Sequence, residues 1–299
     1  MSEDHHTTQP NQQASTGLVP EPVSYLLTLS RPRFWLYLAG PVLVGVAYAA
    51  ASVDDLVAPS ALALFAYFLL PANLFLYGVN DVFDTDVDAE NPKKTGDDAK
   101  EVRFEGQGAV LWVITLSVGL LFSVLLVVPM AAWPWLAGWL FLATNYSAPP
   151  FRFKTTPILD SVSNGLYILP GVAAYAALAG HAPPLLAVLG GWLWTMGMHT
   201  FSAIPDILPD RRAGIQTTAT WLGARHAYWY CAIVWLLAAL GFALIDVRLA
   251  LPLLAYPILA LTVRYSNIDV DRAYWWFPYL NALVGMTLTL GGLWRLLYG

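Results

Sequence analysis

The sequence predicts an all-α membrane protein with about nine transmembrane helices, and two observations lead to this fold class. Hydrophobic residues make up 58% of the 299 residues and charged residues only 12%. The mean hydropathy is +0.56, a balance that a soluble fold of this length does not need. Apolar runs of spanning length also recur along the chain. They cover 34–52, 59–79, 108–128, 132–148, 160–180, 184–205, 227–245, 248–264 and 275–297.

The polar residues before the first apolar run are expected to form a separate tail. Residues 1–22 are rich in His, Thr, Gln, Asn, Pro and Ser, and they lack the basic-then-apolar pattern of a signal peptide. We therefore expect a disordered polar tail (1–22) followed by one nine-span domain (23–299). Cys231 is the only cysteine and lies within a predicted span, which excludes a disulfide framework and a cysteine metal site.

The distribution of basic residues predicts the orientation of the spans. With the N-terminus in the cytoplasm, nine spans place loops 80–107, 149–159, 206–226 and 265–274 inside. All but Arg248 and Arg295 of the 15 Lys and Arg residues then lie on the cytoplasmic side, as the positive-inside rule requires. The sequence therefore predicts a multi-pass protein of the cell membrane.

A first cluster of acids follows the second apolar run directly: Asn80, Asp81, Asp84 and Asp88. At about 100° per residue the three aspartates fall on one face of a helix, whereas Asp86 faces away. Carboxylates beside lipid are costly unless they meet cations or water, and Mg²⁺ carrying a diphosphate would relieve their repulsion. A calcium loop is excluded, because Ala89 and Thr95 replace the required Gly and Glu. A solvated acidic linker remains an alternative.

A second cluster follows the sixth apolar run and contains Asp206 and Asp210. On a helix these two aspartates point about 40° apart, and Pro205 and Pro209 interrupt the span there. Arg211 and Arg212 follow and offer cations for a diphosphate. The alternative is a helix end with interfacial arginines. Because both clusters are predicted to be cytoplasmic, they can meet over one site.

These motifs resemble the UbiA superfamily of membrane prenyltransferases. The resemblance extends from Arg31-Pro32 to the ninth span and includes Tyr146-Ser147-x-Pro149-Pro150. It implies a helical fold around a central cavity open to lipid, in which the two acid motifs hold Mg²⁺ and a prenyl diphosphate. The residues that the resemblance places in the site are Asn80, Asp81, Asp84, Asp88, Asp206, Asp210 and Tyr146, with the aspartates as metal ligands. The expected diphosphate-binding cations are Lys94, Arg152, Lys154, Arg211 and Arg212. The Pro-rich second motif, followed by two arginines, departs from many members.

The chemistry expected of such a site is ionisation of an allylic diphosphate, which Mg²⁺ makes a better leaving group. Aromatic faces stabilise the cation and a dry cavity protects it from water. Trp192, Trp194, His199 and Phe201 precede the second motif, and Asp160 and Asn164 are further candidates for the cavity lining. His199 stands out as an ionisable residue within a span, whereas Asp160 is equally suited to cap a helix.

The stretch 199–220 is most similar to the lycopene elongases within this superfamily. That similarity implies C5 (dimethylallyl) transfer to lycopene in the synthesis of C50 carotenoids such as bacterioruberin, and end-group hydration in archaeal members. Three alternatives stay open: a geranylgeranylglyceryl phosphate geranylgeranyltransferase, a quinone-precursor prenyltransferase, and an ion-coupled transporter. We expect a prenyl diphosphate donor, an apolar isoprenoid acceptor (lycopene) and membrane lipid as partners, no nucleic acid, and a site that faces the cytoplasm.

Overall fold

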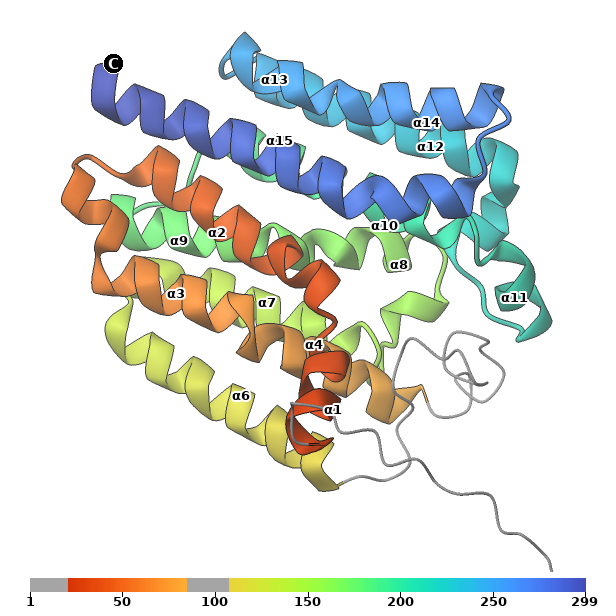
Figure 1. Ribbon diagram of the computed structural model, residues 1–299, viewed down its shortest axis with the longest axis horizontal. Helices are drawn as coiled ribbons and strands as arrows, with labels where there is room; N and C mark the ends of the chain where they lie inside the picture. The colour runs from red at the N-terminus through yellow and green to blue at the C-terminus, as the bar shows by residue number, and fades with distance from the viewer. Residues whose placement is uncertain (1–20, 85–107) are drawn as a thin grey trace, which may run out of the picture.

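The computed structural model describes residues 21–84 and 108–299, which are helical apart from turns and short connections. Nine helical rods in this part of the chain form the bundle of Figure 1. The rods are α2 (Trp35–Ala49), α3 with α4 (Pro59–Leu69, Pro71–Phe83), α6 (Gly108–Val127), α7 (Trp133–Asn145), α8 with the 3₁₀ helix η5 and α9 (Leu159–Val162, Ser163–Tyr167, Leu169–Ala179), α10 (Leu185–Ala203), α12 (Thr218–Ala243), α13 with α14 (Val247–Leu253, Ala255–Tyr265) and α15 (Val270–Tyr298).

Each predicted span coincides with one rod, so the predicted fold class is confirmed. Six helical stretches are long and apolar enough by themselves to cross a bilayer: Pro59–Phe83, Gly108–Val127, Leu159–Ala179, Thr218–Ala243, Val247–Tyr265 and Val270–Tyr298. The largest differences from prediction are at α12 and α15, which begin at Thr218 and Val270. The first turns of both helices carry polar or charged residues, which a search for apolar runs leaves out.

Prolines and glycines explain why several rods are broken. Pro71 separates α3 from α4, and Pro205 lies in the turn between α10 and α11 (Ile207–Arg212). A proline inside a helix removes a hydrogen bond and clashes with the preceding turn. Gly223 kinks α12 with a φ of 72°, a conformation that costs glycine little.

Two hydrophobic cores lie on either side of α2. One surrounds Trp139, whose ring contacts Tyr67, Phe68 and Phe75. The other surrounds Trp235, which contacts Phe201, Tyr256 and Phe277. Helix α2 joins the two halves because it packs closely against α9 and α15. A Cβ at Gly45 would lie 2.2 Å from the carbonyl oxygen of Gly171, the close approach that small residues permit between membrane helices.

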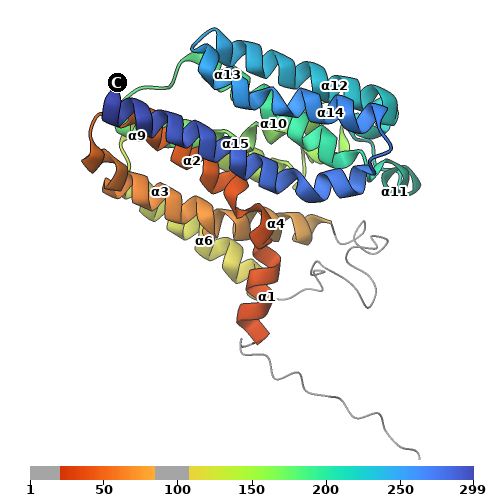
Figure 2. The ribbon, with the colours of Figure 1, turned by 45° about the horizontal axis from the view of Figure 1, so that its top comes forward.

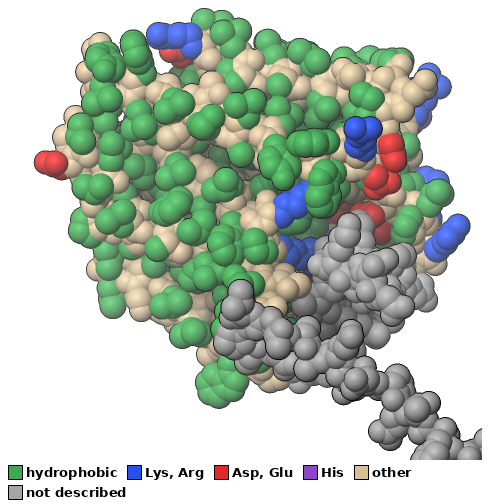
Figure 3. Space-filling view, in the orientation of Figure 1, with side chains coloured by type: hydrophobic (Ala, Val, Ile, Leu, Met, Phe, Trp, Pro, Cys, Tyr) green, Lys and Arg blue, Asp and Glu red, His purple; other side chains and the backbone are tan. Residues whose placement is uncertain are grey.

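Two short helices lie outside the rods and were not predicted. Helix α1 (Glu21–Ser30) projects from the bundle beside α4, and α11 follows α10 (Figure 2). The face seen in Figure 3 is mostly hydrophobic, and many of its charged side chains gather at the end where α11 lies. Long apolar side chains are exposed along the rods, such as Leu126 at 89%. A bilayer accommodates such a surface, since lipid replaces water around the spans.

Candidate active site

A cavity of about 910 Å³ opens at the charged end of the bundle. Its lining combines oxygen-bearing side chains of both acid clusters with aromatic rings from α2, α15 and η5. The acid-cluster residues in the lining are Asn80, Asp84, Asp206 and Asp210. The structure therefore brings together two motifs that are more than a hundred residues apart in sequence.

The first acid cluster is buried at the end of α4 and faces cations from other elements. Asp81 is only 3% exposed, and its carboxylate lies 3.7 Å from the guanidinium of Arg31. Asp84 forms an ion pair with Lys154 and lies 3.8 Å from Arg152. Helix α4 ends at Phe83, and Asp84 follows it as the C-cap residue. Asp86, Asp88 and Lys94 lie outside the described residues, and their roles stay predictions.

The segment after α7 joins the first cluster through side chains. The Ser147 hydroxyl donates a hydrogen bond to the Asn80 amide oxygen, and Tyr146 lines the cavity. The Arg152 guanidinium donates to the carbonyl oxygen of Phe83 at 3.0 Å. The motif around Tyr146 and the basic pair after it therefore lie against the end of α4.

Lys154 lies beside this cluster, and its surroundings shift the pKa of its side chain. It belongs to the connection between α7 and α8. The pKa of Lys154 is lowered from 10.5 to about 7, chiefly by burial; the Asp81 carboxylate opposes this change and the nearby charge of Arg31 adds to it. A lysine in this state gains most from a bound anion, because the anion offsets the cost of burying the charge.

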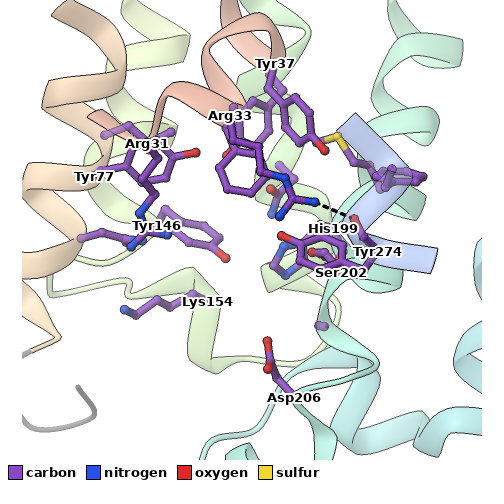
Figure 4. Close-up of a pocket in the computed structure, with 18 of the residues that line it drawn as sticks. Arg31, Arg33, Tyr37, Tyr77, Tyr146, Lys154, His199, Ser202, Asp206 and Tyr274 are labelled. Carbon is purple, nitrogen blue, oxygen red and sulfur yellow. Dashed lines mark hydrogen bonds between the residues drawn. The ribbon is translucent and has the colours of Figure 1, made fainter. Parts of the chain in front are cut away.

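The second acid cluster is held by the turn between α10 and α11. Asp206 precedes α11, and the backbone N–H of Asp210 donates to the carbonyl of Asp206 at 2.8 Å. Both side chains line the cavity, one helical turn apart, and their role as metal ligands stays a prediction. Figure 4 shows Asp206 on the far side of the cavity from Arg31 and Tyr77.

Arg211 and Arg212 do not line this cavity as it stands. The Arg211 guanidinium donates to the carbonyl of Thr220 at 2.8 Å, and Arg212 is exposed. Their expected contact with a diphosphate therefore stays a prediction, and it requires both side chains to leave these positions.

Arg31 and Arg33 are cavity cations that were not among the predicted site residues. Arg31 stacks on the Tyr77 ring, 4.5 Å from its centre. Arg33 stacks on Trp275 at 4.0 Å and donates to the carbonyl of Tyr274 at 3.2 Å. A sequence signal existed, because an Arg-Pro-Arg triplet precedes the first span, but positive-inside arginines are common at such positions.

A polar network lies beside the cavity, next to the predicted second motif. His199 on α10 lines the cavity, and its Nε2 lies 3.2 Å from a carboxylate oxygen of Asp160 on α8. Asp160 is fully buried and also accepts a hydrogen bond from the backbone N–H of Thr218 at 3.0 Å. Asp160 therefore binds the start of α12 and does not cap α8, the helix to which it belongs. Asn164 lines the cavity and donates to the Asp160 carbonyl at 2.6 Å.

The oxygen donors of the cavity fit Mg²⁺. Carboxylates are its preferred protein ligands, and it keeps water and phosphate oxygens in the rest of its octahedron. Within residues 21–84 and 108–299, no group of three acidic, histidine or cysteine side chains is close enough to hold one ion. Each acid cluster would therefore supply one or two ligands, and the donor diphosphate would complete the coordination.

Comparison with known proteins identifies the family. The model of the UbiA prenyltransferase family matches residues 38–294. The chain is 64% identical over 275 residues to the lycopene elongase/hydratase of Haloferax volcanii, a match that covers 92% of this chain and 90% of the relative. It is 54% identical over 292 residues to that of Haloarcula japonica, which covers 97% of this chain and 99% of the relative.

The fold has solved counterparts as well. A UbiA homolog from Archaeoglobus fulgidus, solved with DMAPP and Mg²⁺ bound, superposes with a TM-score of 0.69 at 20% identity, covering 90% of this chain and 99% of that chain. These matches point to the same family as the helical bundle and the two acid clusters over one cavity. The chain belongs to the UbiA prenyltransferase family and is a multi-pass membrane enzyme.

Proposed function

We propose that this enzyme transfers a dimethylallyl group from its diphosphate to lycopene, in the synthesis of C50 carotenoids, and that it requires Mg²⁺. The observation that carries the proposal is the likeness to lycopene elongase/hydratases of haloarchaea at 54–64% identity over nearly the whole chain. The cavity supports it, since one part is lined by carboxylates and the other by aromatic rings.

The donor diphosphate belongs at the acid-lined mouth. Bound Mg²⁺ would neutralise the diphosphate and make it a better leaving group. Lys154 and Arg31 lie next to Asp84 and Asp81, so both cations are within reach of an anion that enters between the clusters. Charge-assisted hydrogen bonds of this kind are the strong ones.

The aromatic part of the cavity suits the allylic cation and the acceptor. Tyr37, Tyr167, Tyr274 and Phe277 line it, and the electron-rich faces of such rings attract positive charge. Walls of this kind also exclude water from the reacting carbons. Lycopene is a hydrocarbon, so it needs an apolar path to this region rather than polar contacts.

A geranylgeranylglyceryl phosphate acceptor is the main alternative within the family, and it would need a second cationic site. In the part of the chain that the structure describes, Arg33 is the candidate, because it lines the cavity and its side chain contacts α15 rather than either acid cluster. Its guanidinium is already held by two backbone carbonyls and the Trp275 ring. Arg225, Arg264 and Arg272 do not line the cavity. This distribution favours the apolar acceptor.

The deciding experiment is expression in cells that make lycopene, followed by analysis of the pigments. We expect C45 and C50 products, and none from an Asp210→Ala variant. Efficient prenylation of geranylgeranylglyceryl phosphate by the purified enzyme, with lycopene unchanged, would instead favour the alternative.

We further propose that the N-terminus and the cavity face the cytoplasm. The cavity-lining residues lie at the end of the bundle that carries most of the basic residues. A cysteine at Asp269 should be labelled only from the cytoplasm, and one at Asp55, near the opposite end, only from outside. Cys231 is fully buried and gives little background. Labelling of Asp269→Cys from outside would contradict this orientation.

A further inference from the structure

His199 and Asp160 form a pair at the cavity wall that ionisation of the donor does not require. The His199 side chain is 14% exposed, whereas that of Asp160 is fully buried. The two residues come from α10 and α8, and Nε2 of the histidine lies 3.2 Å from the carboxylate. Burying a carboxylate costs free energy unless it has hydrogen-bond partners. The partners of Asp160 are therefore the first thing to account for.

The start of α12 fixes the Asp160 carboxylate. Thr218, the first residue of that helix, donates both its backbone N–H, at 3.0 Å, and its hydroxyl. The positive end of a helix dipole stabilises a negative charge at this position. Asp160 is therefore fixed in position and accepts the Nε2–H of His199. That hydrogen bond leaves Nδ1 as the ring nitrogen with a free lone pair.

The pair lies deeper in the bundle than the second acid cluster. His199 lies about one turn before α10 ends at Ala203, and seven residues before Asp206. Its ring meets Tyr146 edge to face, with centroids 5.9 Å apart. Figure 4 shows His199 beside Ser202 and Tyr274. His199 therefore lies next to the Tyr274 ring, in the aromatic part of the lining that suits the acceptor.

The chemistry of the proposed function, on which this inference rests, creates a need for such a base. The C–O electron pair leaves with the diphosphate, and the π pair of an acceptor double bond forms the new C–C bond. Positive charge then rests on the more substituted acceptor carbon. Capture of water there forms a C–O bond and releases one proton, which must be accepted near that carbon.

We propose that Nδ1 of His199 accepts this proton as water adds to the acceptor cation, and that Asp160 is the residue that positions and stabilises the imidazolium. The products are the elongated, hydroxylated acceptor, diphosphate and one proton, which His199 then returns to solvent. A positioned base of this kind contributes typically 10²–10⁴-fold. The diphosphate is a poorer candidate for this proton, because Mg²⁺ and the cations beside Asp81 and Asp84 would hold it at the mouth.

The test is the ratio of hydroxylated to non-hydroxylated elongated carotenoids in lycopene-producing cells. His199→Gln keeps a donor for Asp160 but removes the base, so we expect the ratio to fall at least about tenfold. Incorporation of ¹⁸O from labelled water should fall in parallel. Asp160→Asn should lower the same ratio less. The matched control is His226→Gln on the exposed face of α12, which should leave the ratio unchanged.

A ratio that stays at the wild-type value in both site variants would overturn the inference. So would a loss of all elongated products in proportion, which indicates a structural or ionisation role. If His199→Gln fails to accumulate in membranes, Asp160→Asn decides the outcome. A wild-type enzyme that elongates lycopene without adding water refutes only this inference, whereas one that leaves lycopene unchanged refutes the proposed function as well.

Discussion

The carboxylates at the end of α4 and those around α11 face one cavity, but they are surrounded differently. Asp81 and Asp84 are buried and contact cations supplied by distant segments, Arg31 before α2 and Lys154 after α7. Asp206 and Asp210 are only half buried, and their neighbour Arg211 binds a backbone carbonyl outside the cavity. An arginine adjacent in sequence is therefore no guide to which cations serve an acid cluster.

This difference suggests that the clusters divide the work. The first cluster already carries matched positive charge, which a donor diphosphate and its metal must displace or share. The second offers oxygen ligands that are more open to the cavity. We expect both to be needed, since the described carboxylates of each cluster, Asp81 with Asp84 and Asp206 with Asp210, fill only part of the octahedron of Mg²⁺.

The largest expected effect is loss of either cluster. Asp84→Ala and Asp210→Ala should each lower kcat/KM for the donor at least about 10²-fold, because each removes charge that acts directly on the ionising bond. Membrane insertion should be unaffected. Turnover is measured with purified enzyme, and Asp246→Ala, at the opposite end beside Arg248, is the control. Full activity of the Asp210→Ala variant would show that the second cluster is not a metal site.

The next effect separates the cations. Arg31→Ala should raise KM for the donor about tenfold, since loss of a charge-assisted contact costs about 1.5 kcal/mol. Arg211→Ala should change KM by less than about twofold and act on stability instead, through its bond to Thr220. Donor titrations and thermal unfolding in detergent measure the two quantities. An equal rise in KM for both variants would mean that Arg211 turns into the cavity when the donor binds.

Much of the fold and part of the site follow from the sequence, for identifiable reasons. Spans such as Gly108–Val127 are continuous apolar runs, and hydropathy finds them because lipid surrounds them. Asp84 and Asp210 line one cavity, which agrees with a topology that puts both acid clusters at the same end of the bundle. The Arg31–Asp81 contact did not follow from the sequence, because it depends on how α1 and α2 pack against α4. The polar first turn of α12 was missed because a search for apolar runs leaves it out, and the contact of Thr218 with Asp160 joins residues that are distant in sequence.

The smallest expected effect is a pH dependence of kcat/KM for the donor, caused by Lys154 beside the first cluster. Burial lowers the pKa of Lys154 to about 7, so the side chain is charged below this pH and increasingly neutral above it. The donor is an anion and binds the charged form better. We therefore expect kcat/KM for the donor to fall as pH rises above about 7, by no more than tenfold per pH unit.

Lys154→Arg is the matched variant for that dependence. Arginine keeps its charge throughout this pH range, so the variant should show a flatter profile between pH 7 and 9 even if its absolute activity is lower. Both profiles are measured at constant ionic strength and saturating Mg²⁺, and Arg152→Lys tests whether any change in the basic pair has the same effect. A wild-type profile that is flat over this range would show that the Asp84 carboxylate keeps Lys154 charged despite its burial. In that case the positive charge of Lys154 would already offset the negative charge of Asp84 before the donor arrives.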